Sequence, residues 1–201
     1  MQDILFGFQA DMSQYMISQI ALYFLWIGAC FLINGRMLER IMMEKRYMEL
    51  VRFGTYRSWW GRIVCRLLEK SLIEAVLVCI GYCLCCCREE GFACPQKIIR
   101  AGILWFLGLT IAGMVQMMCN FYWKHGVKMG FPILVLMEGL SVYGGAFSKK
   151  IACFMPGSYM MLERSVVYHE QGYVYGICIS IEILCILLIG TMGYKFGGKH
   201  D

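Results

Sequence analysis

Five long apolar stretches divide the chain, with short polar stretches between them. They cover residues 15–33, 67–87, 101–123, 129–147 and 172–194. Each approaches the roughly 20 apolar residues that an α-helix needs to cross the hydrocarbon core of a bilayer. Alternation with a period of two does not recur over many short segments, so a membrane β-barrel is not expected. The pattern predicts an all-α, polytopic membrane protein with about five spanning helices, in a single transmembrane domain over residues 1–201.

Charged residues are sparse within these stretches. Residues 101–123 contain none, while residues 129–147 and 172–194 contain one each, Glu138 and Glu182. A carboxylate inside a bilayer is a functional candidate, because its burial is costly without a purpose. Two interpretations remain open for this pair: contacts that hold helices or subunits together, or a cavity along a substrate path for cationic cargo. In residues 67–87 we expect Glu74 to pair with Lys70, one helical turn earlier.

The composition agrees with this assignment. The chain is 59% hydrophobic and 16% charged, whereas a soluble domain carries about a quarter charged residues. Only three prolines occur, which argues against extended disordered linkers. The lipid bilayer is therefore the expected surrounding, and no nucleic-acid partner is expected.

Basic residues set the expected orientation. Residues 36–70 hold nine of the 19 lysines and arginines and only four acids, which marks this loop as cytoplasmic. Alternation then places residues 88–97 and 148–171 outside, and residues 124–128 and the C-terminus inside. Residues 1–14 contain two aspartates and no basic residue, as expected outside, and they lack the features of a cleavable secretory signal. The expected location is the plasma membrane of a bacterium, with multiple crossings.

The inner loop carries an unusual cluster. Residues 36–51, "RMLERIMMEKRYMELV", predict a charged helix with a broken apolar stripe. Gly54 then offers a chain break, and Trp59 and Trp60 stand where the next span begins. One interpretation is a basic interfacial helix with an aromatic anchor at the level of the lipid headgroups.

A second interpretation comes from resemblance. "MELVRFGTYRSWWGRIVCRLL" resembles the cytoplasmic loop of type-2 ABC exporter permeases, above all the small, divergent membrane subunits of Firmicutes linked to bacteriocin export or immunity. Their R-x-G-S-R-x-x-W-W pattern is matched by five residues, with Thr55 and Tyr56 in place of the usual serine step. The matching residues are Arg52, Gly54, Arg57, Trp59 and Trp60. "FMPGSYMMLERS", residues 154–165, resembles the last outer loop of the same family.

The resemblance implies a function and a set of partners. The five stretches would correspond to the second to sixth spans of the family, with a coupling helix inside and a re-entrant segment outside. The five matching residues would contact a separate ABC ATPase subunit, which would hold ATP and magnesium, and a second permease subunit, identical or different, would complete the transporter. Such a subunit would export a peptide or give bacteriocin immunity without being an enzyme itself. A non-transporting accessory subunit of a permease complex is an alternative.

Other chemistry is weakly supported. The "CLCCC" run at residues 83–87 lacks the ligand spacing of a zinc site, and Cys94 and Cys153 could pair outside. A membrane peptidase that processes a signal peptide is a further alternative, but it needs a cysteine beside a histidine. His169 and Cys178 are nine residues apart and would not share a helix face. No Walker motif occurs, so we expect no catalytic residues, metal site or cofactor in this chain.

Overall fold

The computed structural model describes residues 17–44, 46–86, 95–123, 126–147 and 172–197. Within these ranges every residue is helical except Gly54 and Thr55, which confirms the all-α class for the described chain. The elements are α2 (Ile17–Glu39), the π-helical turn η2 (Arg40–Glu44), α3 (Arg46–Phe53), α4 (Tyr56–Cys86), α5 (Pro95–Trp123), α6 (Gly126–Phe147) and α10 (Gly172–Gly197). The described part of each predicted apolar stretch falls within one long helix. The outer segment 148–171, with its expected re-entrant turn, lies outside the described residues.

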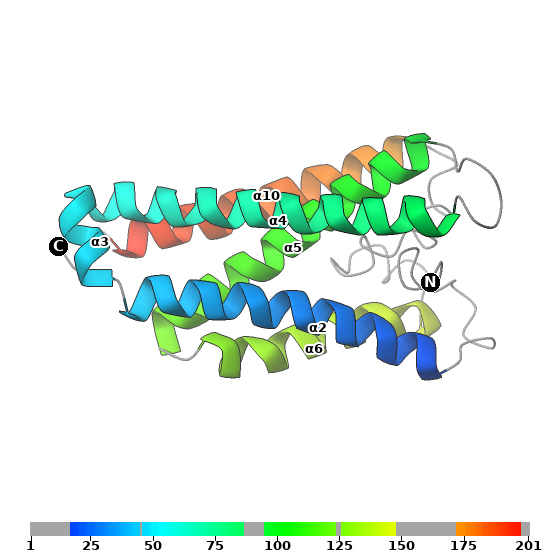
Figure 1. Cartoon of the computed structure of the whole chain (residues 1–201), viewed down its shortest axis with the longest axis horizontal. Coiled ribbons are helices and arrows are strands. Elements are labelled where there is room, and N and C mark those ends of the chain that lie inside the picture. The colour runs from blue at the N-terminus through cyan, green and yellow to red at the C-terminus, as the bar shows by residue number, and fades with distance from the viewer. Residues whose placement is uncertain (1–16, 45, 87–94, 124–125, 148–171, 198–201) are drawn as a thin grey trace.

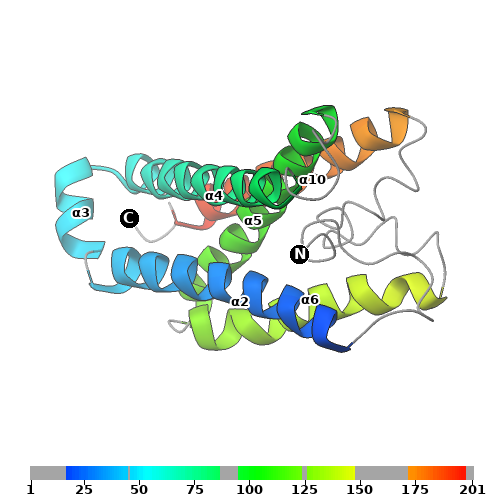
Figure 2. The ribbon, with the colours of Figure 1, turned by 45° about the vertical axis from the view of Figure 1, so that its right-hand side comes forward.

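Helix α5 is the centre of the molecule. In Figure 1, α4 and α10 form an upper pair, α2 and α6 form a lower pair, and α5 crosses diagonally between them. The turned view in Figure 2 keeps the same arrangement. Helix α5 contacts all four of these helices. A helix without charges from Ala101 to Trp123 can be buried on several sides, so its sequence suits this position.

Glycines on α5 allow α4 to approach closely. A Cβ atom at Gly102 would lie 2.7 Å from the Sγ atom of Cys79, and one at Gly113 would overlap the side chain of Leu67. Small residues of this kind let two helix backbones come together when lipid, rather than water, surrounds the pair. The contact between α4 and α5 is the most extensive helix pairing in the described chain.

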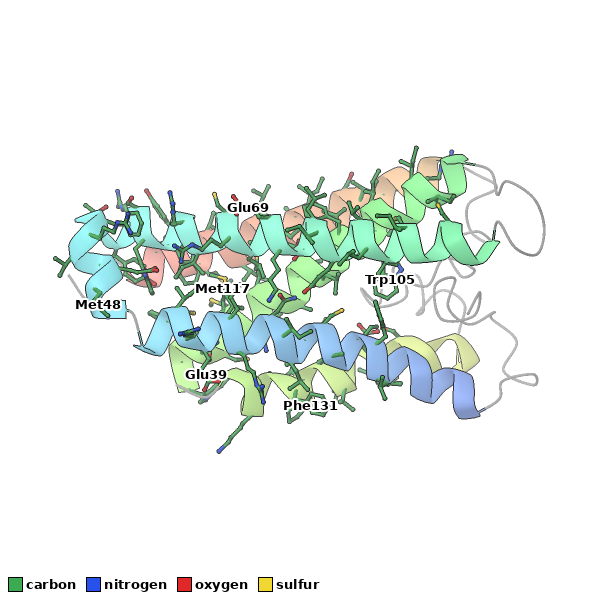
Figure 3. All side chains as sticks on the ribbon, in the orientation of Figure 1. Glu39, Met48, Glu69, Trp105, Met117 and Phe131 are labelled. Carbon is green, nitrogen blue, oxygen red and sulfur yellow. The ribbon has the colours of Figure 1, made fainter. Side chains whose placement is uncertain are left out.

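Two apolar clusters fill the space between the upper and lower pairs. Figure 3 shows Trp105 in one cluster and Met117 in the other, both between the helix layers. The first contains Ile27, Cys30, Phe31, Ala75, Val78, Trp105, Leu109 and Leu134. The second, which we call the tryptophan cluster, contains Leu38, Ile41, Met42, Tyr56, Trp59, Trp60, Ile63, Leu67, Met114 and Met117.

The charged segment after α2 differs from the sequence prediction. The pattern predicts one helix over residues 36–51, whereas α2 continues to Glu39, a π-helical turn follows, and α3 begins at Arg46. Nothing in residues 34–39 stops α2, because the segment contains no proline and its glycine remains helical. The π-helical turn adds a residue to the helical repeat and brings Ile41 and Met42 together into the tryptophan cluster.

Two described segments are long and apolar enough to span a membrane, Ile98–Trp123 and Gly176–Lys195. They differ in their surroundings, since 53% of the first is buried inside the molecule and only 11% of the second. Leucines and isoleucines lie on the open face of the second segment: Ile177, Ile183, Leu184, Leu187 and Leu188. This face of α10 therefore needs an apolar environment that the described chain does not supply.

Candidate functional site

The turn between α3 and α4 is built around Gly54. This residue has a φ of 70°, a left-handed conformation that glycine adopts more easily than other residues. Its N–H donates to the carbonyl oxygen of Leu50 over 2.9 Å, which closes the end of α3. The N–H of Ser58 donates to Oγ1 of Thr55 over 3.3 Å, so Thr55 caps the start of α4. The predicted chain break at Gly54 is confirmed.

Trp59 and Trp60 lie inside the molecule. Their exposed fractions are 1% and 3%, so the expectation that they anchor the helix among lipid headgroups is wrong. The physical reason is helical spacing. Tyr56, Trp59, Trp60 and Ile63 follow one another at intervals of three, one and three residues, which puts them on one face of α4. All four belong to the tryptophan cluster together with Met117 of α5.

Trp60 joins the start of α4 to the end of α10. Its Nε1–H donates to the carbonyl oxygen of Gly190 over 3.2 Å. A Cβ atom at Gly193 would overlap the indole ring, so the ring lies directly against the backbone there. One turn of α4 earlier is Arg57, whose guanidinium carbon lies 4.8 Å from the ring centroid of Tyr194, within the range of a cation–π interaction. Three neighbouring contacts therefore fix these two helix ends together.

Exposed arginines cover the outer side of this turn. We call residues 46–66 the arginine turn; Arg52, Arg57 and Arg62 within it are exposed. Arg62 lies over the ring of Phe53, with 5.5 Å from its guanidinium carbon to the centroid. Arg66 Nη1 pairs with Oε1 of Glu49 at 3.0 Å, which ties α4 to α3. Guanidinium groups held in this way can bind carboxylates or phosphates through two parallel hydrogen bonds.

The arginine turn thus brings together the five residues that the sequence singles out. Gly54 shapes the turn, Arg52 and Arg57 face outward, and Trp59 and Trp60 lie beneath them in the core. Sequence analysis does not identify Gly193 and Tyr194, the partners on α10. They lie more than 130 residues further along the chain, and no local pattern connects them with the tryptophans.

Glu74 interacts electrostatically with Lys70, as predicted, but its hydrogen-bond partner lies on another helix. Its Oε2 atom accepts a hydrogen bond from Nδ2 of Asn34 over 2.9 Å. Lys70 donates instead to the carbonyl oxygen of Ile33 over 3.2 Å. Both bonds run from α4 to α2, so these polar groups connect the upper and lower helix pairs rather than stabilising α4 alone.

Glu138 lies in a buried polar site between α2, α5 and α6. Its exposed fraction is 4%, compared with 2% for Asn34 and 0% for Gln116. All three line a cavity of about 10 Å³ whose other walls are apolar. Nε2 of Gln116 donates to the carbonyl oxygen of Phe31 over 3.1 Å. Asn34 and Gln116 are not identified from the sequence, although Gln116 is an amide within an apolar stretch and Asn34 directly follows one, a signal that could have found them.

Glu182 is buried more deeply, at 1% exposure on α10. Within the described chain neither of its carboxylate oxygens has a hydrogen-bond partner. An ionised carboxylate in such surroundings is costly unless it is paired, and it does not line the cavity beside Glu138. Both carboxylates are therefore buried, but Glu182 is not among the residues that line the cavity beside Glu138.

The described residues were compared with the metal-binding and cysteine hypotheses raised by the sequence. No group of three or more histidines, cysteines, aspartates or glutamates that could hold a metal ion occurs among the described residues. Cys83 and Cys119 are free thiols. Cys94, Cys153 and His169, which the pairing and peptidase hypotheses need, lie outside the described residues.

No family model matches the chain, and neither a curated protein nor a solved structure is significantly similar to it.

Proposed function

We propose that this chain is the membrane subunit of an ABC transporter that exports a peptide or gives bacteriocin immunity. A separate ATPase subunit drives it, and a second permease subunit, identical or different, completes the transporter. The observation that carries the proposal is the arginine turn. It presents exposed guanidinium groups at one end of the helices and is joined through Trp60 to the last turns of α10.

A multi-pass location in the bacterial plasma membrane is part of the proposal. Five long helices with exposed apolar side chains support it, α10 most of all. The positive-inside bias of residues 36–70 puts the arginine turn and the C-terminus in the cytoplasm and the N-terminus outside. In Figure 1 the arginine turn and the C-terminal end of α10 lie at the same end of the molecule, as this orientation requires.

The coupling mechanism follows from the contacts at the turn. An ATPase subunit that binds Arg52 and Arg57 through carboxylates would pull on α3 and the first turn of α4. Trp60 and Arg57 would pass this movement to α10, because their contacts to Gly190 and Tyr194 cross between the two helices. Large, close-packed side chains transmit displacement rather than absorb it.

Glu138 and Glu182 are the carboxylates of the proposed transport path. In the described conformation the cavity beside Glu138 has a volume of about 10 Å³, far too small for a peptide. A path past Glu138 therefore requires α2, α5 and α6 to separate, which is the kind of movement that ATP-driven domain motion supplies.

The test changes the surface of the turn and leaves its core intact. Alanine at both Trp59 and Trp60 would remove two buried indoles and unfold the region, so it cannot isolate coupling. We propose instead to purify the tagged chain from its own membranes with its bound proteins. The double variant Arg52→Glu/Arg57→Glu should lose a Walker-motif ATPase and its ATP hydrolysis, while insertion and the thermal unfolding temperature stay near those of the unchanged chain.

Two controls sharpen the result. Arg100→Glu reverses an exposed charge on α5, away from the arginine turn, and should leave the ATPase bound. Gly54→Asn keeps the left-handed conformation accessible, whereas Gly54→Val opposes it, so only the valine variant should weaken ATPase binding. If no Walker-motif ATPase accompanies the unchanged chain, or if the double arginine variant keeps it fully active, the proposed function is wrong.

A further inference from the structure

Helices α4 and α5 enclose an apolar groove, which we call the α4–α5 groove. Its volume is about 410 Å³. Small residues from both helices lie where α4 and α5 meet: Ala75, Cys79 and Gly102. Large apolar side chains form its two sides and are exposed: Leu72, Val76, Ile80, Ile99 and Ile103. The groove is therefore open to the surroundings of the molecule.

The chemistry of the groove excludes a polar occupant. Among the described residues that line it, none is charged and none carries a hydroxyl or amide side chain. Its polar atoms are two thiols, and Sγ of Cys79 already contacts the carbonyl oxygen of Ile98 at 3.8 Å. A polar or charged group placed there would lose its hydrogen bonds to water without replacement. The part of a ligand that enters the groove must therefore be apolar.

The length of the groove restricts the occupant further. Its lining residues on α4 run from Leu72 to Cys83, eleven residues apart, which corresponds to about 16 Å of helix. One leaflet occupies half of the roughly 30 Å hydrocarbon core of a bilayer. A helix from another chain, which is about 10–12 Å wide with its side chains, could lie over the groove but could not enter it. The dimensions fit one lipid acyl chain.

The position of the groove supplies a place for the lipid headgroup. The groove lies toward the C-terminal end of α4 and the N-terminal end of α5, and these ends are opposite the arginine turn in Figure 1. Arg100 is exposed and directly follows Ile99 of the groove. It is also the last charged residue before the apolar stretch 101–123, so its guanidinium can reach the membrane surface.

The charge of Arg100 favours an anionic headgroup. A guanidinium group binds a phosphate through two parallel hydrogen bonds. Its five N–H donors let it hold a phosphate beside another contact. An acyl chain in the groove would bring the phosphate of its own lipid to the same end of α5.

We propose that the α4–α5 groove binds one acyl chain of an anionic phospholipid whose phosphate pairs with Arg100. This inference goes beyond the proposed function, because it requires no ATPase. It rests only on the membrane location that is part of that function.

Photolabelling in lipid vesicles tests the proposal. The purified full chain is placed in phosphatidylcholine vesicles that contain a small share of a lipid with a diazirine in its acyl chain, either phosphatidylglycerol or phosphatidylcholine. Peptide mass spectrometry then locates the attached lipid. Labelling by phosphatidylglycerol should concentrate on the α4–α5 groove and disappear when unlabelled phosphatidylglycerol is added in excess. The exposed apolar face of α10, with Leu187 and Leu188, should be labelled by both lipids without such competition, as expected for bulk lipid.

A matched pair of variants tests the groove itself. Ile80→Trp places a larger side chain in the groove and should abolish the labelling that phosphatidylglycerol competes for. Ile73→Trp is the control, because Ile73 is also exposed on α4 but does not line the groove. Both changes are at exposed positions, so the thermal unfolding temperature should stay near that of the unchanged chain.

A third variant tests the headgroup contact. Arg100→Gln should lower labelling of the groove by phosphatidylglycerol by up to about fivefold, the range for an exposed ion pair. Labelling by phosphatidylcholine should not change in this variant, because its headgroup carries no net charge.

Three outcomes would overturn the proposal. The first is phosphatidylglycerol labelling that spreads evenly over all exposed apolar faces, and the second is equal labelling of the groove by the two lipids. The third is groove labelling that Ile80→Trp leaves unchanged. These results in a chain that inserts into the vesicles would leave the proposed function intact, whereas a chain that does not insert would contradict both.

Discussion

At the scale of single residues, Gly193 is the glycine at which the structure leaves least room for a side chain. The indole of Trp60 occupies the space that a Cβ atom would need, whereas nothing lies within 4 Å of a Cβ atom at Gly190 on the same helix. Gly193→Ala should therefore destabilise the chain by about 1–3 kcal/mol, the usual cost of overpacking a tight contact. Thermal unfolding of the purified protein in detergent measures this change.

Gly190→Ala is the matched control for that measurement. It adds the same methyl group one turn earlier and leaves the carbonyl oxygen that Trp60 binds unchanged. Its unfolding temperature should equal or exceed that of the unchanged chain, since alanine favours a helix more than glycine does. Equal losses in both variants would show that Trp60 does not lie against Gly193.

The structural role of some residues can be predicted from the sequence, whereas that of others cannot. Gly54 can be identified because a glycine between two helical patterns is a local signal, and its positive φ agrees with that prediction. Gly193 carries no such signal, since its role depends on a ring from another helix. The Glu74 prediction is incomplete for a related reason. A local partner at Lys70 was available, but Asn34, forty residues away, supplies the hydrogen bond once α2 and α4 come together.

At the scale of elements, α3 depends on few contacts and one ion pair. Arg66 of α4 holds Glu49 of α3 at 3.0 Å, and both side chains are partly exposed. Such pairs contribute about 0.2–1 kcal/mol. A double-mutant cycle with Glu49→Gln and Arg66→Met should give a coupling energy in this range that decreases at high salt. A coupling energy of zero at low salt would mean that other contacts, such as Phe53 with Arg62, hold α3 in place.

The helices themselves are easier to predict than their ends. Long apolar stretches fix where α5, α6 and α10 occur, because burial or lipid must cover each of them. The ends are set by weaker effects. Helix α4 begins at Tyr56, 11 residues before the apolar stretch predicted from Leu67, since Thr55 caps it and Trp59, Trp60 and Ile63 are buried in its first turns. The charged residues Arg57, Arg62 and Arg66 keep these first turns out of the apolar stretch, although they are helical.

At the scale of the whole molecule, α5 has the role that its sequence suits best. Its apolar stretch, residues 101–123, contains no charged residue, and α5 makes extensive contacts with all four other long helices of the described chain. Hydropathy alone does not distinguish this helix from α10, which is mostly uncovered. Composition shows that a stretch avoids water, but only packing shows whether protein or another apolar medium covers it.

The last prediction concerns orientation. Consecutive long helices run in opposite directions, so that the arginine turn, the C-terminal end of α5, the N-terminal end of α6 and the C-terminal end of α10 share one end of the molecule (Figure 1). The excess of basic residues in the arginine turn should hold that whole end in the cytoplasm. A reporter enzyme that works only in the cytoplasm should therefore be active when it is fused after Asp201. A reporter enzyme that works only outside the cell should be active when it is inserted in residues 88–97. Replacing Arg52, Arg57 and Arg62 by glutamine should raise the share of chains with the opposite orientation, whereas the same replacement at Arg100 should not. If both reporters give the reversed pattern in the unchanged chain, the arginine turn faces outward and cannot meet an ATPase.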